Sequence, residues 1–409
     1  MSNAALKTAQ MRKFGWYGLL KNLKFFEPYL LLYMIFAGLT FTEIGILYAI
    51  REAIVWIFEI PSGVFADRFG KKTELIASFV FYIASFIGFA LADSFAWFVV
   101  PMVLFGFGEA FRSGTHKAMI MAYLDHQAID LPKRQVYGYT RSYSNVGSVV
   151  SSLFGIALIL SMPDMSLLFL IAIVPYVLDL VLIASYPSFL NKRIDRRFSL
   201  VEFVRETGRA LAYAVKHVRL RLYLVESAGF QAIFKSMRDY IQPLLYGATL
   251  TVLLLADRSL DDNIKIIIGL TYAVAQLVSV FVTRHAYRLG DYMSSGTLLA
   301  LTWAMTATMA IALGLWSTSI PIILISFVMF YAALNLRKPY MVQKIGDATV
   351  DEKRASVLSI ESQLSSVLII ILAPVMGWIS DTYSIGTMFL VLGSAMVVTG
   401  LIRYTKKGA

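Results

Sequence analysis

Long apolar segments alternate with short polar segments along almost the whole chain. Each apolar segment is long enough, at about 20 residues, for one helix to cross the hydrocarbon core of a bilayer. The pattern therefore predicts an all-α integral membrane protein with about twelve transmembrane helices. We place these helices near residues 17–39, 43–66, 74–92, 96–121, 137–160, 165–186, 220–247, 264–283, 293–314, 317–341, 354–379 and 384–403.

One polar segment, from Tyr186 to about Arg221, is much longer than the others and separates two groups of six spans. After Ser199 its apolar residues recur at helical spacing, and Glu202 completes a capping-box pattern. Two interpretations stay open, a solvated connector or an amphipathic helix on the inner leaflet. We expect a cytoplasmic segment at 1–16, a six-helix bundle at 17–186, a cytoplasmic linker at 187–219, a second six-helix bundle at 220–403 and a cytoplasmic tail at 404–409.

The composition excludes a soluble globular protein and several kinds of chemistry. Charged residues make up only 15% of the chain, whereas soluble domains carry about 25%. Cysteine is absent, which rules out disulfides, thiolate metal sites and cysteine nucleophiles. The sequence has no Walker loop, HExxH motif or dense cluster of histidines and aspartates. We therefore expect no enzyme activity, no cofactor and no metal.

The placement of lysine and arginine explains the net charge of +11. Short loops rich in these residues alternate with loops that are almost bare of them, and only the loop near 256–265 departs from the alternation. Because short basic loops stay on the cytoplasmic side, both termini are expected to be cytoplasmic, and the charge indicates topology rather than nucleic-acid binding. We expect no cleavable signal peptide, and Met11 is an alternative start.

The two halves show a weak internal repeat. Arg112 and Arg337 fall at similar places, near the fourth and the tenth spans. Each is followed by a cytoplasmic loop with a basic pair, in KRQVYGYTR and KRASVLSIE, and then by another charge at matching spacing, Arg141 and Glu361. Duplicated six-span halves are typical of alternating-access transporters.

The stretch GVFADRFGKK, residues 63–72, is a densely charged turn between two apolar segments. It resembles the loop between spans two and three of the major facilitator superfamily, whose pattern is roughly G-x-x-x-D-R-x-G-R/K-K/R. The twelve spans and the central loop extend the resemblance over the whole chain. It implies a secondary transporter built from two pseudo-symmetric six-helix bundles. The matching residues are Gly63, Asp67, Arg68, Gly70, Lys71 and Lys72.

The resemblance also implies a role for the aspartate of this turn. In the family it faces the start of span eleven, where unpaired N–H groups carry partial positive charge. Asp67 would then latch the two halves on the inside, and the alternative is that the turn only anchors the topology. The chain departs from the family's drug–proton antiporters, because Met102 stands where their arginine precedes the glycines matched by Gly106 and Gly108.

Charges inside the spans mark the candidate substrate site, because an ionisable group at mid-bilayer costs about 2.5–3.5 kcal/mol. The resemblance implies that spans one, four, seven and ten line a central cavity. Basic residues are in excess there, and arginine suits carboxylate and phosphate oxygens, so we expect an anionic substrate. Alternatively, Glu109–Arg112 and Lys235–Asp239 are ion pairs that only fix helix packing. The candidate substrate-binding residues are Arg112, Arg337, Glu109, Lys235 and Arg238.

Other ionisable residues suggest proton coupling or gating. Glu27 precedes Pro28, so a role in starting a helix is as plausible as a proton site. His116 is the only histidine inside a predicted span, and its ordinary pKa suits a proton carrier, although a packing role is the alternative. The candidate proton-coupling residues are Glu109, Glu27, His116 and Asp239. The resemblance places the remaining charges, Glu52, Glu59, Arg141 and Glu361, between the bundles.

The sequence therefore predicts a secondary transporter of a small organic solute, anionic in character and coupled to a proton or another ion. A transporter of an amphipathic or lipid-like substrate, such as a lysolipid or a drug, is one alternative, and a non-transporting sensor of the same fold is another. We expect a monomer in the bacterial cytoplasmic membrane, in contact with lipid and not with nucleic acid.

Overall fold

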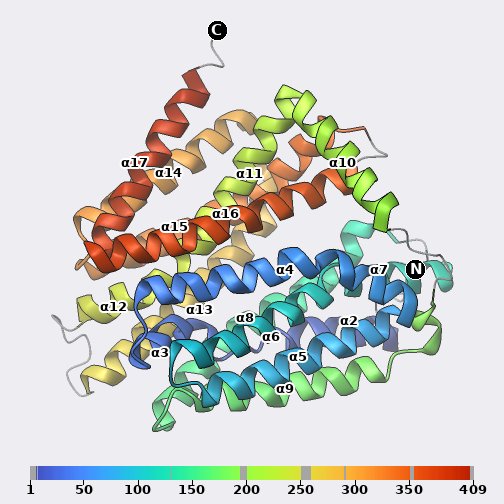
Figure 1. Ribbon diagram of the computed structural model, residues 1–409, viewed down its shortest axis with the longest axis horizontal. Coiled ribbons are helices and arrows are strands. Elements are labelled where there is room, and N and C mark those ends of the chain that lie inside the picture. Colours follow the sequence, from blue (N-terminus) through green and yellow to red (C-terminus); the bar gives the residue numbers. More distant parts are fainter. Residues whose placement is uncertain are drawn as a thin grey trace. The chain divides into compact units, whose positions relative to one another are not determined.

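The computed structural model describes residues 6, 8–129, 131–193, 200–249, 259–289, 292–350 and 354–405, and these residues contain helices and no strand (Figure 1). The first elements are α2 (Ala9–Leu20), the 3-10 turn η1 (Glu27–Tyr29), α3 (Leu30–Phe36), α4 (Phe41–Phe69), α5 (Lys71–Leu91), α6 (Phe95–Arg112), α7 (Thr115–His126), α8 (Lys133–Ser161), α9 (Leu167–Ala184) and the 3-10 turn η2 (Ser188–Asn191). They are followed by α10 (Leu200–Lys216), α11 (Val218–Met237), the 3-10 turn η3 (Arg238–Tyr240), α12 (Ile241–Thr249), α13 (Leu260–Leu289), α14 (Ser295–Leu315), α15 (Ile320–Asp347), α16 (Arg354–Thr382) and α17 (Ile385–Thr405).

The chain divides into two compact units. The first unit comprises Met1–Tyr33 and Ile50–Phe198, and the second comprises Met34–Ala49 and Ser199–Ala409. Helices α5 to α9 belong to the first unit and α10 to α17 to the second, whereas α4 begins in the second unit and continues into the first. The first turns of α4 are bound to α16, because Asp381 accepts hydrogen bonds from the backbone N–H groups of Phe41 and Thr42.

In the described part of the chain, nine helices are long and apolar enough to cross a membrane. The other three expected spans fall short for identifiable reasons. The first is divided among α2, η1 and α3, and the seventh is divided among α11, η3 and α12. The second, α4, is 29 residues long but carries Arg51, Glu52 and Glu59 in its central turns. These features account for the difference between nine apolar helices and about twelve expected spans.

Three spans that we expected to be continuous are interrupted. In the seventh span, Pro243 lacks an N–H group and its ring crowds the carbonyl of Asp239, which places the interruption at Arg238–Tyr240. In the first span, Pro28 follows Glu27 at the start of η1. In the fourth span, Gly114 adopts a left-handed φ of 75° between α6 and α7. Interrupted helices expose backbone polar groups, which is tolerated at membrane depth only where protein or water satisfies them.

The core of the first unit is an aromatic cluster in which α5 packs on α6 and α9 (Figure 1). Phe169 of α9 stacks on Phe26 and on Phe89, with ring centroids 4.7 and 5.1 Å apart. Phe86 meets Tyr176 edge to face at 4.7 Å. Such ring pairs add about 0.5–1.5 kcal/mol to the free energy gained by burial. This cluster holds α5, α6 and α9 in the positions that place the charged side chains described below.

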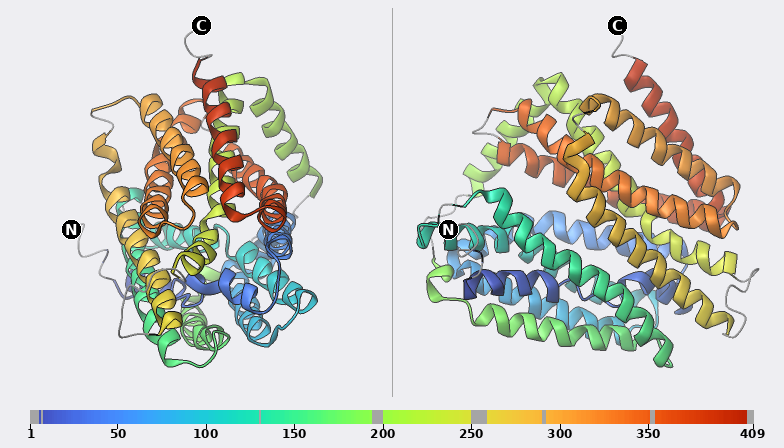
Figure 2. Two further views of the ribbon diagram at one scale, coloured as in Figure 1. Left: turned by 90° about the vertical axis from the view of Figure 1, so that its left-hand side faces the viewer. Right: turned by 180° about the vertical axis from the view of Figure 1, so that it is seen from behind.

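The helices of the second unit pack mainly as four pairs, α14 with α17, α11 with α16, α14 with α15, and α13 with α15 (Figure 2). Small residues permit the close approach of α14 and α17. A Cβ atom added to Gly393 would lie 2.7 Å from a side-chain carbon of Ile311, so the pair requires glycine there. Close packing through small residues is a usual way for transmembrane helices to associate, because lipid supplies no hydrophobic drive between them.

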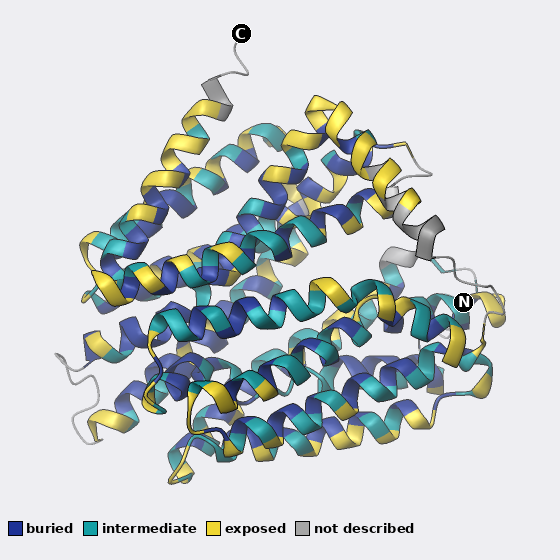
Figure 3. Ribbon diagram, in the orientation of Figure 1, coloured by how far each residue is buried: buried dark blue, intermediate teal, exposed yellow. Residues whose placement is uncertain are grey.

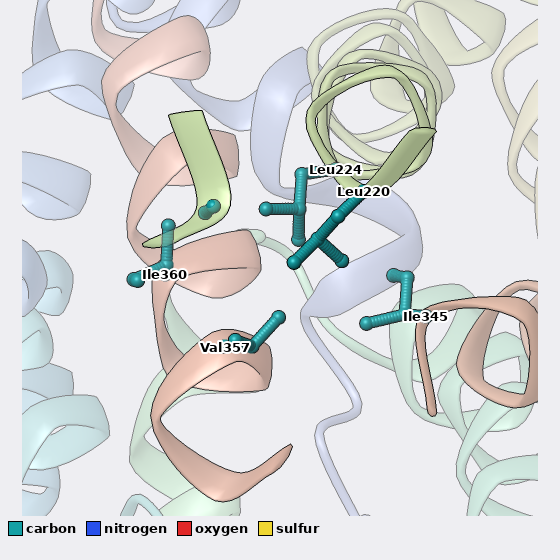
Figure 4. Close-up of a cluster of buried hydrophobic side chains, with 6 residues drawn as sticks. Leu220, Leu224, Ile345, Val357 and Ile360 are labelled. Carbon is teal, nitrogen blue, oxygen red and sulfur yellow. The ribbon is translucent and has the colours of Figure 1, made fainter. Parts of the chain in front are cut away.

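The linker contains α10, most of whose described residues are exposed (Figure 3). Its last turns nevertheless pack on α11 and α16 through the buried Ala214. Leu220 and Leu224 of α11 point toward Val357 and Ile360 of α16 in the same cluster, which Ile345 of α15 completes (Figure 4). The expected cap at Ser199 lies outside the described residues, and the membrane-surface role of α10 stays a prediction.

Candidate functional site

The charged turn at residues 63–72 joins α4 to α5 at Gly70, whose φ is 96°. Residues other than glycine rarely adopt this conformation, and a Cβ atom at Gly70 would also collide with Asn191. Gly63 differs, because a Cβ atom there would meet open space. Only one of the two motif glycines is therefore required by the local geometry.

Asn191, a residue that the sequence did not single out, binds the motif turn. Its Oδ1 atom accepts hydrogen bonds from the backbone N–H groups of Lys72 and Thr73, at 3.1 and 3.2 Å, so it satisfies free donors at the start of α5. Lys72 also donates through Nζ to the carbonyl of Tyr186, just beyond α9, at 2.9 Å. The turn thus ties α5 to the end of α9 within the first unit. The roles of Asp67, Arg68 and Lys71 in a latch stay predictions.

A cluster of charges, which we call the Arg112 site, lies in the first unit. Arg112 and Glu109 are three residues apart on α6, and an Nη2–Oε2 distance of 2.6 Å joins them. The Nζ atom of Lys24, from the connection between α2 and η1, lies 3.6 Å from Oε1 of Glu109. The hydroxyl of Tyr82, on α5, donates to Glu109 at 2.6 Å and accepts from Nε of Arg112 at 3.0 Å. Three elements therefore converge on one carboxylate.

The Arg112 site carries two cations and one anion, so it has an excess positive charge. The ammonium of Lys24 also lies over the rings of Tyr82 and Phe105, 5.9 and 5.1 Å from their centroids, and cation–π attraction stabilises it there. The side chains of Lys24, Glu109 and Arg112 remain 20%, 26% and 24% exposed. Part of each side chain is therefore accessible to solvent.

Arg337, on α15, has a different environment in the second unit. Its Nη2 atom lies 2.6 Å from Oε1 of Glu226, on α11, and the two side chains are only 3% and 1% exposed. Nη1 donates to the carbonyl of Leu299 and, at 3.0 Å, to the hydroxyl of Thr302. The centroid of the Phe230 ring lies 4.3 Å from the guanidinium carbon. No acid stands three or four residues from Arg337 in the sequence, and the structure supplies Glu226 as its partner.

Glu361 binds α11 instead of Arg337. It accepts hydrogen bonds from the hydroxyl of Ser227, at 2.6 Å, and from the amide of Gln231. Of the other residues expected between the bundles, Glu52 is buried beside Arg51 at 3.2 Å, Glu59 is partly buried and Arg141 is exposed on α8. Their gating role stays a prediction.

The charges of the seventh span meet at its interruption. Asp239 in η3 contacts Nε of Arg238 at 3.2 Å and accepts hydrogen bonds from the hydroxyls of Tyr48 and Tyr272, also at 3.2 Å. The helical i, i+4 relation that we expected to Lys235 is lost, because α11 ends at Met237, and Lys235 is exposed. Asp239 therefore links η3 to α4 and α13, and its role in proton coupling stays a prediction.

His116 packs as an aromatic residue. Its ring stacks on Tyr17 with centroids 3.6 Å apart, and Phe14 meets it edge to face at 5.3 Å. Its Nε2 atom lies 3.4 Å from the hydroxyl of Tyr186. This geometry favours the packing role over proton transport. Glu27 stands at the first position of η1, before Pro28, where a carboxylate suits a helix start.

Asp179, the single charged residue of α9, is not among the site residues predicted from the sequence. It is fully buried, and among the described residues neither of its carboxylate oxygens has a hydrogen-bond partner. The signal was available, since an acid within LLFLIAIVPYVLDLVLIA is an ionisable group inside a predicted span. No second charge stands at helical spacing beside Asp179, so no ion pair was predicted there.

The chain matches the sequence model described as Major Facilitator Superfamily over residues 14–335. It is 22% identical over 387 residues to the uncharacterized MFS-type transporter YxaM of Bacillus subtilis (strain 168), covering 93% of this chain and 91% of that protein. The nucleoside transporter NupG has a similar structure, with a TM-score of 0.78 at 13% identity over 97% of this chain and 98% of NupG. A POT family transporter in complex with 5-aminolevulinic acid gives a TM-score of 0.72 at 13% identity, over 96% of this chain and 94% of that chain.

Proposed function

Because this chain belongs to the Major Facilitator Superfamily and is a multi-pass membrane transporter, we propose that it carries a small organic anion by alternating access. An ion gradient, with the proton as the first candidate, drives the transport. The basic loops favour an orientation with both termini in the cytoplasm, and we propose that the carrier acts as a monomer in a bacterial membrane.

One observation carries the proposal, the excess positive charge of the accessible Arg112 site. Lys24 and Arg112 share the single carboxylate of Glu109, at 3.6 and 2.6 Å, and each cation is only partly buried. A carboxylate or phosphate that enters can pair with the arginine fork in two parallel hydrogen bonds. Glu109 occupies that fork in the structure, so the substrate competes with Glu109 for Arg112.

We infer that Arg337 has a structural role. Its guanidinium is enclosed by Glu226, Leu299 and Thr302, and its ion pair is almost inaccessible. Removing one partner of such a pair leaves an uncompensated buried charge. The geometry therefore supports a stabilising role for Arg337 better than contact with a substrate. Our expectation that Arg112 and Arg337 face one cavity stays a prediction.

The shared fold does not select the substrate. The solved structures that resemble this chain include a nucleoside transporter and a transporter that holds 5-aminolevulinic acid, and these compounds differ in charge and size. The choice of an anion depends on the charges of the Arg112 site alone.

A ligand screen tests the proposal. Carboxylates, phosphate esters, organic amines, nucleosides and lysolipids are compared by thermal shift on the purified protein, and the compounds that bind are tested for uptake into proteoliposomes. We expect carboxylates or phosphate esters to raise Tm and to be transported. Binding of amines or neutral compounds alone would contradict the proposal. Transport of lysolipids would support the alternative of an amphipathic substrate.

A further inference from the structure

Asp179 lies in the second half of α9, and its exposed fraction is 0%. Within the described residues, both of its carboxylate oxygens lack a hydrogen-bond partner. An ionised carboxylate in this position has given up its hydration without receiving hydrogen bonds in exchange, which costs far more than burial of the neutral acid. The surroundings therefore favour a carboxyl group that holds a proton.

Five titratable or charged groups lie within electrostatic range of Asp179. Lys21 of α2 and Arg112 of α6 act on the Asp179 carboxyl, and Asp179 in turn acts on Tyr17 of α2, Tyr176 of α9 itself and Tyr186 just beyond α9. Helices α5 and α8, which also pack on α9, add no titratable group to this set in the part of the chain that the structure describes. From α5 the apolar Phe79 contacts the rings of Tyr17 and Tyr176, with centroids 5.9 and 5.3 Å apart.

The two cations near Asp179 are directed elsewhere. Arg112 pairs with Glu109, and the Lys21 ammonium lies 5.5 Å from the ring centroid of Tyr17. Neither forms an ion pair or a hydrogen bond with Asp179 within the described residues. A buried carboxyl group with neither oxygen hydrogen-bonded is unusual in a native interior, where such groups are nearly always satisfied.

We propose that Asp179 is the proton-binding site of this transporter and that Arg112 couples it to the substrate. The inference rests on the proposed function, because it needs an anion at Arg112. A proton from the aqueous phase adds to the Asp179 carboxylate to form one O–H bond, and it leaves the same oxygen on the other side of the membrane. Glu109 is less suited to this role, since three donors already hold its carboxylate.

The coupling follows from charge. The positive charge of Arg112 favours the ionised form of Asp179, and an anion bound at Arg112 offsets that charge. Substrate binding therefore favours the protonated carboxyl, and by reciprocity the bound proton favours the anion by the same factor. Proton and anion bind together and cross the membrane in the same direction, which is symport.

The test compares three variants of the full-length protein in proteoliposomes. Asp179→Asn imitates the neutral acid, Asp179→Glu retains an acid, and Asp164→Asn is the control. Asp164 is an exposed loop acid near the start of α9 that accepts hydrogen bonds from Ser166. The readouts are the infrared C=O band of protonated carboxylic acids, Tm, uptake driven by a pH gradient, and exchange of labelled for unlabelled substrate without a gradient.

We expect the wild-type protein and Asp164→Asn to show the carboxylic-acid band at neutral pH, and Asp179→Asn to lose it with an unchanged Tm. Asp179→Asn should also lose gradient-driven accumulation and keep exchange, whereas Asp179→Glu should accumulate substrate at a reduced rate. An unchanged band in Asp179→Asn, or gradient-driven accumulation in that variant at the wild-type rate, would overturn the inference, because either result means that Asp179 does not bind the coupled proton. The band needs no substrate, so a protein that shows it but binds no anion would refute the proposed function and leave the proton site standing.

Discussion

Arg112 and Glu109 lie one turn apart on α6, and 2.6 Å separates their facing nitrogen and oxygen atoms. Arg337 and Glu226 make a contact of the same length between two helices of the second unit. The two pairs differ in exposure, since about a quarter of each side chain is accessible in the first and 3% or less in the second. The first pair can therefore exchange one partner for a solute, whereas the second pair can be broken only by leaving a charge buried.

Breaking the buried pair should destabilise the protein. Glu226→Gln leaves the Arg337 guanidinium without its carboxylate, and the loss of one partner of a buried pair costs about 3–5 kcal/mol. We expect a lower Tm and a smaller yield of folded protein in detergent. The matched control is Asp261→Asn, which breaks the pair of Asp261 with Lys265, because the Asp261 side chain is 60% exposed and such pairs contribute little. Equal Tm values for the two variants would refute the structural role of Arg337.

The two glycines of the charged turn should respond differently to the same substitution. Gly70→Ala forces a Cβ atom into a left-handed conformation and against Asn191, so we expect loss of at least about 1–2 kcal/mol of stability. Gly63→Ala places a Cβ atom in open space within α4, where alanine is the better helix former by about 1 kcal/mol. Thermal unfolding of both variants should show a lower Tm for the first and an equal or higher Tm for the second. A drop in Tm for Gly63→Ala would contradict this account of the turn.

The cap supplied by Asn191 can be tested separately. Asn191→Ala removes the oxygen that accepts from the backbone of Lys72 and Thr73, and loss of such a cap costs about 0.5–2 kcal/mol. We expect a modest fall in Tm with unchanged affinity for substrate, because the cap lies apart from the Arg112 site. A Tm equal to that of the wild-type protein would show that water replaces the cap.

If Asp67 acts as a latch, its replacement should change the rate of exchange between inward-facing and outward-facing states and not the stability of the fold. Asp67→Asn keeps the size of the side chain and removes its charge, so the protein should fold while the exchange between inward-facing and outward-facing states is altered. Exchange of labelled substrate in proteoliposomes measures that rate. Wild-type rates in this variant would reduce the turn to a topology anchor.

The sequence predicts the spans because apolar runs of about 20 residues have few other structures open to them in a membrane. It also predicts the Glu109–Arg112 pair, since residues three apart share a helical face. It does not predict Glu226 as the partner of Arg337, 111 residues away, or Asn191 as the cap of the motif turn, 119 residues from Lys72. Both contacts depend on how helices pack, which periodicity within one segment does not encode.

The helix interruptions show a second limit of sequence patterns. Hydropathy treats residues 220–247 as one span, yet Pro243 ends the regular hydrogen bonding four residues earlier and creates η3. That interruption removes the expected pairing of Lys235 with Asp239 along a continuous helix. The sequence shows the proline, but only the backbone of the folded chain shows how the interruption changes the positions of the side chains.

The central claim is that an organic anion binds Arg112. The most direct test measures the dissociation constant of the tightest-binding anion in two variants of the Glu109–Arg112 pair. Arg112→Lys keeps the charge and loses the fork, so binding should weaken about tenfold or more. Glu109→Gln removes the competitor for Arg112, so binding should strengthen, and Arg205→Lys on the exposed part of α10 should change nothing. Opposite shifts for Arg112→Lys and Glu109→Gln are the predicted result. Unchanged affinity in both variants, or weaker binding in both by the same factor, would contradict anion binding at Arg112.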